Sequence, residues 1–110
     1  MAKLELISPA QVALLNDWLD LKSALEGSSS NTLLAYKRDL IDFFSFLTLH
    51  NGSKDGVSQL ETINQASMRS WMAENRRSGK TSRSIARQLS SVKSFYKWFA
   101  KRRGIDPTMV

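Results

Sequence analysis

The chain has 110 residues, which is enough for one domain with one modest hydrophobic core. Its content of 42% hydrophobic and 24% charged residues is that of a folded domain and excludes a disordered tail. The lack of cysteine excludes disulfides and thiolate chemistry, and no apolar run is long enough for a signal peptide or a membrane span. We therefore expect one cytoplasmic domain over residues 1–110.

The net charge of +6 is distributed unevenly along the chain. Residues 1–75 contain 6 Lys and Arg against 9 Asp and Glu, whereas residues 76–110 contain 10 against 1. This concentration is typical of a surface that binds a polyanion, although a solvated helix surface would give the same pattern.

Ser8 and Pro9 predict the start of the first helix, and Gly27 predicts its end. Serine caps helices, proline suits the first helical position, and Gln11 completes a capping box. The apolar residues between these signals recur at helical spacing, so we expect them to be buried. They are Leu14, Leu15, Trp18, Leu19, Leu21 and Leu25.

A second helix is predicted over residues 31–49, after a serine-rich connector in which Ser29 or Ser30 would provide the cap. Asn51 and Gly52 end it. Apolar residues at alternating steps of three and four predict its buried stripe, which is Leu33, Tyr36, Leu40, Phe43, Phe44 and Leu47. The residues predicted to lie away from this stripe are Asn31, Leu34, Arg38, Asp42 and Ser45.

A polar segment of about ten residues without strand alternation predicts a loop after the second helix. Asn64 then predicts the cap of a third helix, which ends at residues 78–79. Ile63 and Met68 are placed to form a hydrophobic staple across this cap. The other buried residues expected in this helix are Trp71 and Met72.

The fourth helix is predicted from Thr81 or Ser82 to about Arg102. Projection at 100° per residue separates its side chains into an apolar side and a basic side. The apolar side is Ile85, Leu89, Val92, Tyr96 and Phe99, and the basic side is Arg83, Arg87, Ser90, Ser94, Lys97 and Lys101. The four segments predict an all-α fold without a strand pair.

The basic side of the fourth helix lacks the glutamates of a helix stabilised by its own ion pairs. Arginine can bind phosphate or a guanine edge through two parallel hydrogen bonds, and serine allows close approach and donates to phosphate. Lys80, Thr81 and Ser82 add a helix N-terminus suited to phosphate. These residues favour double-stranded DNA, bound in the major groove, over a merely solvated surface.

Asn31, with Thr32 beside it, is open to two interpretations. An exposed asparagine near a helix start can contact adenine or phosphate, but it is more often a solvated or capping residue. Trp98 borders the basic side and could stack on a sugar, dock another domain or cover the edge of the helices.

No catalytic or metal-binding group is evident. Tyr36 and Tyr96 lie on apolar stripes, which favours core packing over a role as nucleophile. His50 has no second ligand at metal-binding spacing, and no paired carboxylates suit acid and base catalysis. We therefore expect no metal, no cofactor, no small-molecule substrate and no membrane partner.

Two segments resemble the N-terminal core-binding domain of tyrosine recombinases, and the Xer branch in particular. In SSSNTLLAYKRDLIDFFSFL, the positions of that family's motif are occupied by Ser29, Thr32, Tyr36, Asp39 and Leu40. The stretch SGKTSRSIARQLSSVKSFYKWFAKRRGI is similar to the last helix of the same domain.

The resemblance implies a SAM-like bundle of four helices that forms half of a clamp around DNA, with the second and fourth helices facing the major groove. By position it makes Asn31, Thr32, Arg38, Arg83 and Arg87 the expected contacts, with Arg87 first among them for a base edge. It also implies that other recombinase subunits are partners.

Catalysis in that family resides in a following domain, and no His-x-x-Arg set occurs in this chain. We therefore expect an isolated DNA-binding domain, ending at the interdomain linker, without the catalytic domain of its parent recombinase. The alternative is a helical protein-interaction module that mediates contacts between recombinase subunits without binding DNA.

Overall fold

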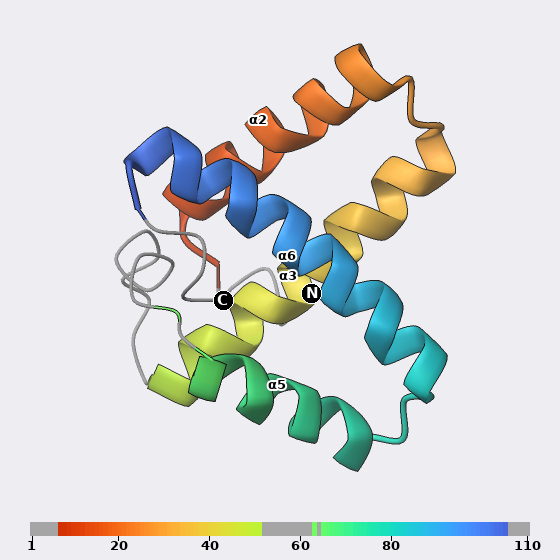
Figure 1. Ribbon diagram of the computed structural model, residues 1–110, viewed down its shortest axis with the longest axis vertical. Coiled ribbons are helices and arrows are strands. Elements are labelled where there is room, and N and C mark those ends of the chain that lie inside the picture. The colour runs from red at the N-terminus through yellow and green to blue at the C-terminus, as the bar shows by residue number, and fades with distance from the viewer. Residues whose placement is uncertain (1–6, 52–62, 64, 106–110) are drawn as a thin grey trace. The chain divides into compact units, whose positions relative to one another are not determined.

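The computed structural model describes residues 7–51, 63 and 65–105. They form four helices, α2 (Pro9–Glu26), α3 (Ser30–Asn51), α5 (Gln65–Arg77) and α6 (Ser82–Arg103) (Figure 1). No strand occurs in this part of the chain, so the predicted all-α class with four helices is confirmed. The helices α2 and α3 belong to one compact unit, residues 1–59, and α5 and α6 belong to a second, residues 60–110.

Some predictions lie outside the described residues, namely the loop over residues 53–62 and the cap at Asn64. The prediction that residues 1–110 act as one domain stays a prediction. None of the helices in the described segments is both long and apolar enough to cross a membrane.

Helix α2 begins and ends as its capping residues dictate. The Ser8 hydroxyl accepts a hydrogen bond from the Gln11 backbone N–H at 3.2 Å, and the Gln11 side-chain oxygen accepts one from the Ser8 N–H at 3.0 Å. This is the predicted capping box, and it satisfies two N–H groups that have no partner inside the helix. Gly27 ends α2 in the left-handed conformation, with φ of 59°, which glycine adopts without a steric penalty.

Aromatic and aliphatic side chains join the two helices of the first unit. The ring centroids of Trp18 on α2 and Tyr36 on α3 lie 5.4 Å apart, and Trp18 is 1% exposed. Tyr36, predicted to be buried, is half-buried, and it packs on Trp18 without being enclosed. The remaining predicted residues that are buried are Leu14, Leu15, Leu40, Phe43, Phe44 and Leu47.

The first unit also departs from the predicted stripes. Leu21 is 37% exposed and Leu25 is 75% exposed, so the prediction that both are buried is wrong. Helical spacing gives the direction of a side chain, but burial also needs a neighbouring element at the same height along the helix. Ser45, predicted to lie away from the core, is buried, and its hydroxyl donates to the Ile41 carbonyl at 2.7 Å.

In the second unit, a short turn connects α5 to α6. The Asn75 carbonyl accepts from both the Ser78 hydroxyl, at 3.0 Å, and the Lys80 backbone N–H, at 3.1 Å. Thr81 then caps α6, since its hydroxyl oxygen accepts from the Ser84 backbone N–H at 3.1 Å. These bonds fix where α6 begins and hence which residues occupy its first turn.

The buried side of α6 contains most of the residues that its periodicity predicts. Ile85, Val92, Tyr96 and Phe99 are buried, whereas Leu89 is half-buried. The sequence prediction missed four further buried residues of this helix, which are Gln88, Ser91, Phe95 and Ala100. In α5, Met68 and Trp71 are buried as predicted, and Met72 is half-buried.

Candidate nucleic-acid interface

The side of α6 opposite its buried stripe is exposed and basic. Arg83, Arg87, Ser90 and Lys97 are exposed, and Ser94 is half-buried. Helix α6 contains seven Lys or Arg residues and no Asp or Glu, so it provides no acidic side chain of its own to neutralise them. We call the side formed by Arg83, Arg87, Ser90, Lys93, Ser94, Lys97 and Lys101 the basic face.

Sequence reasoning missed Lys93 as a member of this face. The structure exposes Lys93, and it lies one turn from Lys97 on the same helix. In the described part of the chain, Arg83, Lys93 and Lys97 have no carboxylate within ion-pair distance. The projection of α6 could have found Lys93, because it falls at the edge of the basic side.

The N-terminal end of α6 adds the positive end of the helix dipole to the charge of the basic face. Thr81 and Ser82 are exposed, as a contact with phosphate requires. The Thr81 hydroxyl uses one lone pair as the cap, and its O–H remains a possible donor. Because the first N–H groups of a helix carry partial positive charge, this end suits an anion.

Lys80 has a different orientation from the arginines of the basic face. Its side chain is half-buried, and its Nζ donates to Oε1 of Gln88 at a long distance of 3.4 Å. Gln88 is only 6% exposed and projects about 100° around α6 from Arg87. The Lys80 ammonium therefore lies toward the buried side of α6, while Arg83 and Arg87 are on the outside.

The candidates on α3 belong to the first unit. Asn31 and Arg38 are exposed and lie seven residues apart, so they share one side of α3 two turns apart. Thr32 is half-buried, and its hydroxyl lies 2.9 Å from that of Ser29. Ser29 also accepts from the Thr32 backbone N–H at 3.2 Å, so the Ser29–Thr32 pair forms the cap of α3.

The other residues of the recombinase-like motif in α3 are buried or pack against α2. Asp39 is 1% exposed and Leu40 is fully buried, while Tyr36 packs on Trp18. A buried side chain cannot contact a ligand at the surface. The motif positions of this segment therefore cap and pack α3, and the exposed Asn31 and Arg38 lie between them.

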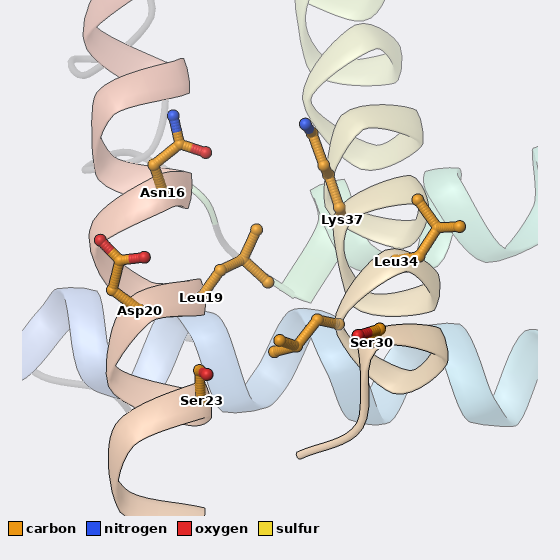
Figure 2. A pocket seen from close by; sticks show the side chains of 8 residues that line it. Asn16, Leu19, Asp20, Ser23, Ser30, Leu34 and Lys37 are labelled. Atoms are coloured by element: carbon orange, nitrogen blue, oxygen red, sulfur yellow. The ribbon is translucent and has the colours of Figure 1, made fainter. Parts of the chain in front are cut away.

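An open groove of about 380 Å³ lies between α2 and α3 (Figure 2). Leu19 points from α2 toward α3, and most of the other side chains that line the groove are polar. Its lining is Asn16, Leu19, Asp20, Ser23, Ser30, Leu33, Leu34 and Lys37. The lining contains no His or Cys, and none of the predicted DNA-binding residues lies in it.

Within the described segments, no cluster of three His, Cys, Asp or Glu side chains could hold a metal ion. His50 is exposed and stacks on Phe46, with ring centroids 5.2 Å apart. The exposed residues of the candidate interface are cations and hydroxyls, together with the amide of Asn31.

Comparison with known proteins identifies the family. Residues 15–104 match the family described as phage integrase, N-terminal SAM-like domain. The chain belongs to this family. Its resemblance to tyrosine recombinases, inferred from two segments, is thereby confirmed over nearly the whole chain.

Curated relatives agree with this membership. The chain is 34% identical over 88 residues to tyrosine recombinase XerC of Rickettsia typhi, covering 80% of this chain and 29% of that protein. It is 33% identical over 101 residues to tyrosine recombinase XerC of Brucella suis, and the match covers 89% of this chain and 32% of that protein. The chain thus spans about a third of the length of these relatives. No solved structure matches it significantly.

Proposed function

We propose that this SAM-like domain is the DNA-binding half of a clamp in a site-specific tyrosine recombinase. The observation that supports the proposal best is the basic face of α6, which is exposed on a helix without a single acidic residue. Burial of the opposite side fixes the rotation of the helix, so the cations of this face all point outward. Such a surface suits the phosphates of duplex DNA.

In this proposal, α6 lies in the major groove, whose width admits a helix. Arg87 contacts a base edge, and the other cations of the basic face position the helix on phosphates. Lys80, Thr81 and Ser82 contact a phosphate at the start of α6, and Asn31, Thr32 and Arg38 of α3 add further contacts. Lys80 can do so only if its ammonium leaves Gln88.

The parent protein is proposed to cleave and rejoin DNA strands through a domain beyond this chain, because the relatives are named tyrosine recombinases and are about three times as long. Its partners are duplex recombination sites and other recombinase subunits, in the cytoplasm, without a cofactor. The chain itself binds DNA and does not cleave it. Covalent protein–DNA adduct on a nicked recombination site would contradict this last point.

The salt dependence of duplex binding tests the proposal. If about four phosphates are neutralised, the slope of log K against log salt is roughly −3.6, at about −0.9 per phosphate. Affinity then falls roughly 150-fold between 50 and 200 mM salt. Arg83→Gln is expected to make the slope less steep by about 0.9, because one phosphate contact is lost.

The matched control is Arg77→Gln, which removes one exposed arginine of the same unit. Arg77 lies on α5, outside the basic face, and pairs with Glu74 at 3.3 Å. We expect its slope to equal that of the unchanged chain. If both variants reduce the steepness of the slope equally, the effect depends only on net charge. If the affinity of the unchanged chain does not depend on salt, a protein-interaction module is favoured instead.

Base reading by Arg87 is tested separately. Arg87→Ala is expected to cost about 1 to 3 kcal/mol on a cognate site and less on random duplex. Equal losses on the two duplexes would show that Arg87 contacts only phosphate.

A further inference from the structure

The groove between α2 and α3 is lined by two sets of residues with the same spacing (Figure 2). Each helix contributes residues at positions i, i+3, i+4 and i+7, so each set shares one side of its helix. The sets are Asn16, Leu19, Asp20 and Ser23 on α2, and Ser30, Leu33, Leu34 and Lys37 on α3. This is the spacing with which a helix contacts a neighbouring helix.

The two helices contribute opposite charges to the groove. Asp20 on α2 and Lys37 on α3 are both exposed (Figure 2). Among the residues that the structure describes, neither of them has an ion-pair partner. A complementary partner therefore presents a cation to α2 and an anion to α3.

Leucines give the same groove an apolar surface. Leu34 is 46% exposed, and Leu19 and Leu33 are half-buried. Single exposed leucines are common on protein surfaces, but here one lies in a groove with two others and between opposite charges. Ser23 and Ser30 are small, so another helix can approach closely.

The packing of the two helices fixes the relative height of the charges. A connector of three residues joins α2 to α3, and Trp18 packs on Tyr36, so the helices are antiparallel neighbours with residues 18 and 36 at one level. Residue 37 is then level with residue 17, and Asp20 lies about 4.5 Å further along the axis of α2. The flexible stem of a lysine side chain is long enough to span this offset.

A second copy of the same two helices presents the complementary charges. Rotation by 180° about an axis along the groove places α3 of the copy over α2, and α2 of the copy over α3. Asp20 then faces Lys37 of the copy, and Lys37 faces Asp20 of the copy. Rotation about an axis across the groove would instead place like helices, and hence like charges, opposite each other.

We propose that the α2–α3 groove docks on the same groove of a second copy of this chain. The resulting dimer has two-fold symmetry and contains two Asp20–Lys37 ion pairs between the copies. Leu34 of each copy comes level with Asp20 of the other and is covered by α2 of that copy. The inference concerns the first unit alone and does not depend on the proposed DNA binding of α6.

Sedimentation equilibrium of the full chain without DNA measures the dimer. We expect a Kd on the order of 100 µM, because each copy contributes only two helices to the contact. Asp20→Lys and Lys37→Asp are each expected to weaken the dimer roughly thirtyfold, since two attractive pairs become two repulsive ones. The two variants change the net charge in opposite directions, so a loss in both cannot be an effect of net charge.

A mixture of the two variants tests the two-fold pairing. The chain with two cations in its groove meets the chain with two anions, so a heterodimer with about the original affinity is expected. The double variant Asp20→Lys/Lys37→Asp should likewise dimerise as the unchanged chain does. Loss in the single variants without recovery in the mixture would overturn the inference. An unchanged chain that remains monomeric at about 1 mM would also overturn it and leave the groove to a helix of another protein.

A pair of leucine variants tests the apolar part of the contact. Leu34→Ala is expected to weaken the dimer about tenfold, because the side chain is covered in both copies. Leu25→Ala is the matched control, since Leu25 is 75% exposed but projects about 140° around α2 from Asp20 and does not line the groove. Its dimer should be as strong as that of the unchanged chain. Equal losses in both variants would overturn the inference, and circular dichroism checks that each variant is folded.

Discussion

Thr81 allows the stability of α6 and its proposed contact with phosphate to be separated. Its hydroxyl accepts the Ser84 backbone N–H at 3.1 Å, and its side chain is exposed. Thr81→Ala therefore removes a cap without leaving a cavity, and the expected loss in the free energy of unfolding is about 1 kcal/mol. For a domain of this size the melting temperature should fall by roughly 4 to 8 °C.

Thr81→Asp is expected to keep the stability of α6 but to weaken DNA binding. Aspartate caps a helix at least as well as threonine, and its negative charge interacts favourably with the helix N-terminus, so stability should be unchanged or higher. The same carboxylate would repel a phosphate about 4 Å away by about 1 kcal/mol even in water, which corresponds to an affinity roughly fivefold lower. Thr81→Ser should resemble the unchanged chain in both measurements.

Thermal unfolding followed by circular dichroism measures the first effect, and duplex binding at fixed salt measures the second. Ser8→Ala is the control, because it removes the equivalent cap of α2 and should lower stability without changing DNA affinity in the folded chain. If Thr81→Ala melts at the original temperature, the capping argument is wrong. If Thr81→Asp binds duplex as tightly as the unchanged chain, the start of α6 does not face a phosphate.

Two further predictions concern stability alone and are measured by chemical denaturation. Leu15→Ala removes a side chain that is 1% exposed and should cost about 2 to 5 kcal/mol, whereas Leu25→Ala, at 75% exposed, should change stability by less than about 0.5 kcal/mol. Similar losses of stability at both positions would contradict the difference in exposure between the two side chains. Gly104→Ala places a Cβ on a residue with φ of 72° and should cost about 1 to 2 kcal/mol. No loss would show that the helix end rearranges readily.

Local signals in the sequence were sufficient to predict the elements. The capping box at Ser8, the helix start at Thr81 or Ser82 and the glycine at 27 act within one turn of the chain, so their effects can be derived without a fold. Apolar spacing predicted four helices for the same reason, since it depends only on the period of the helix. The basic side of α6 followed from the same projection.

The burial of polar side chains could not be predicted from local sequence. Gln88 and Ser91 are 6% and 3% exposed, and Asn75 is 3% exposed, although residue type favours the surface for all three. Their environment depends on the elements that pack around them. The orientation of Lys80 toward Gln88, eight residues away, and the position of Arg102 over Trp98 depend in the same way on where neighbouring side chains lie.

The sequence by itself determined where helices start and stop and which side of α6 is charged, because both follow from hydrogen bonding and periodicity within a few residues. Only the tertiary structure decided how far each apolar stripe is covered, so that Trp18 is buried and Leu25, two turns later, is exposed. The reason is that burial requires another element at that height along the helix, and its position is set by contacts between residues distant in sequence.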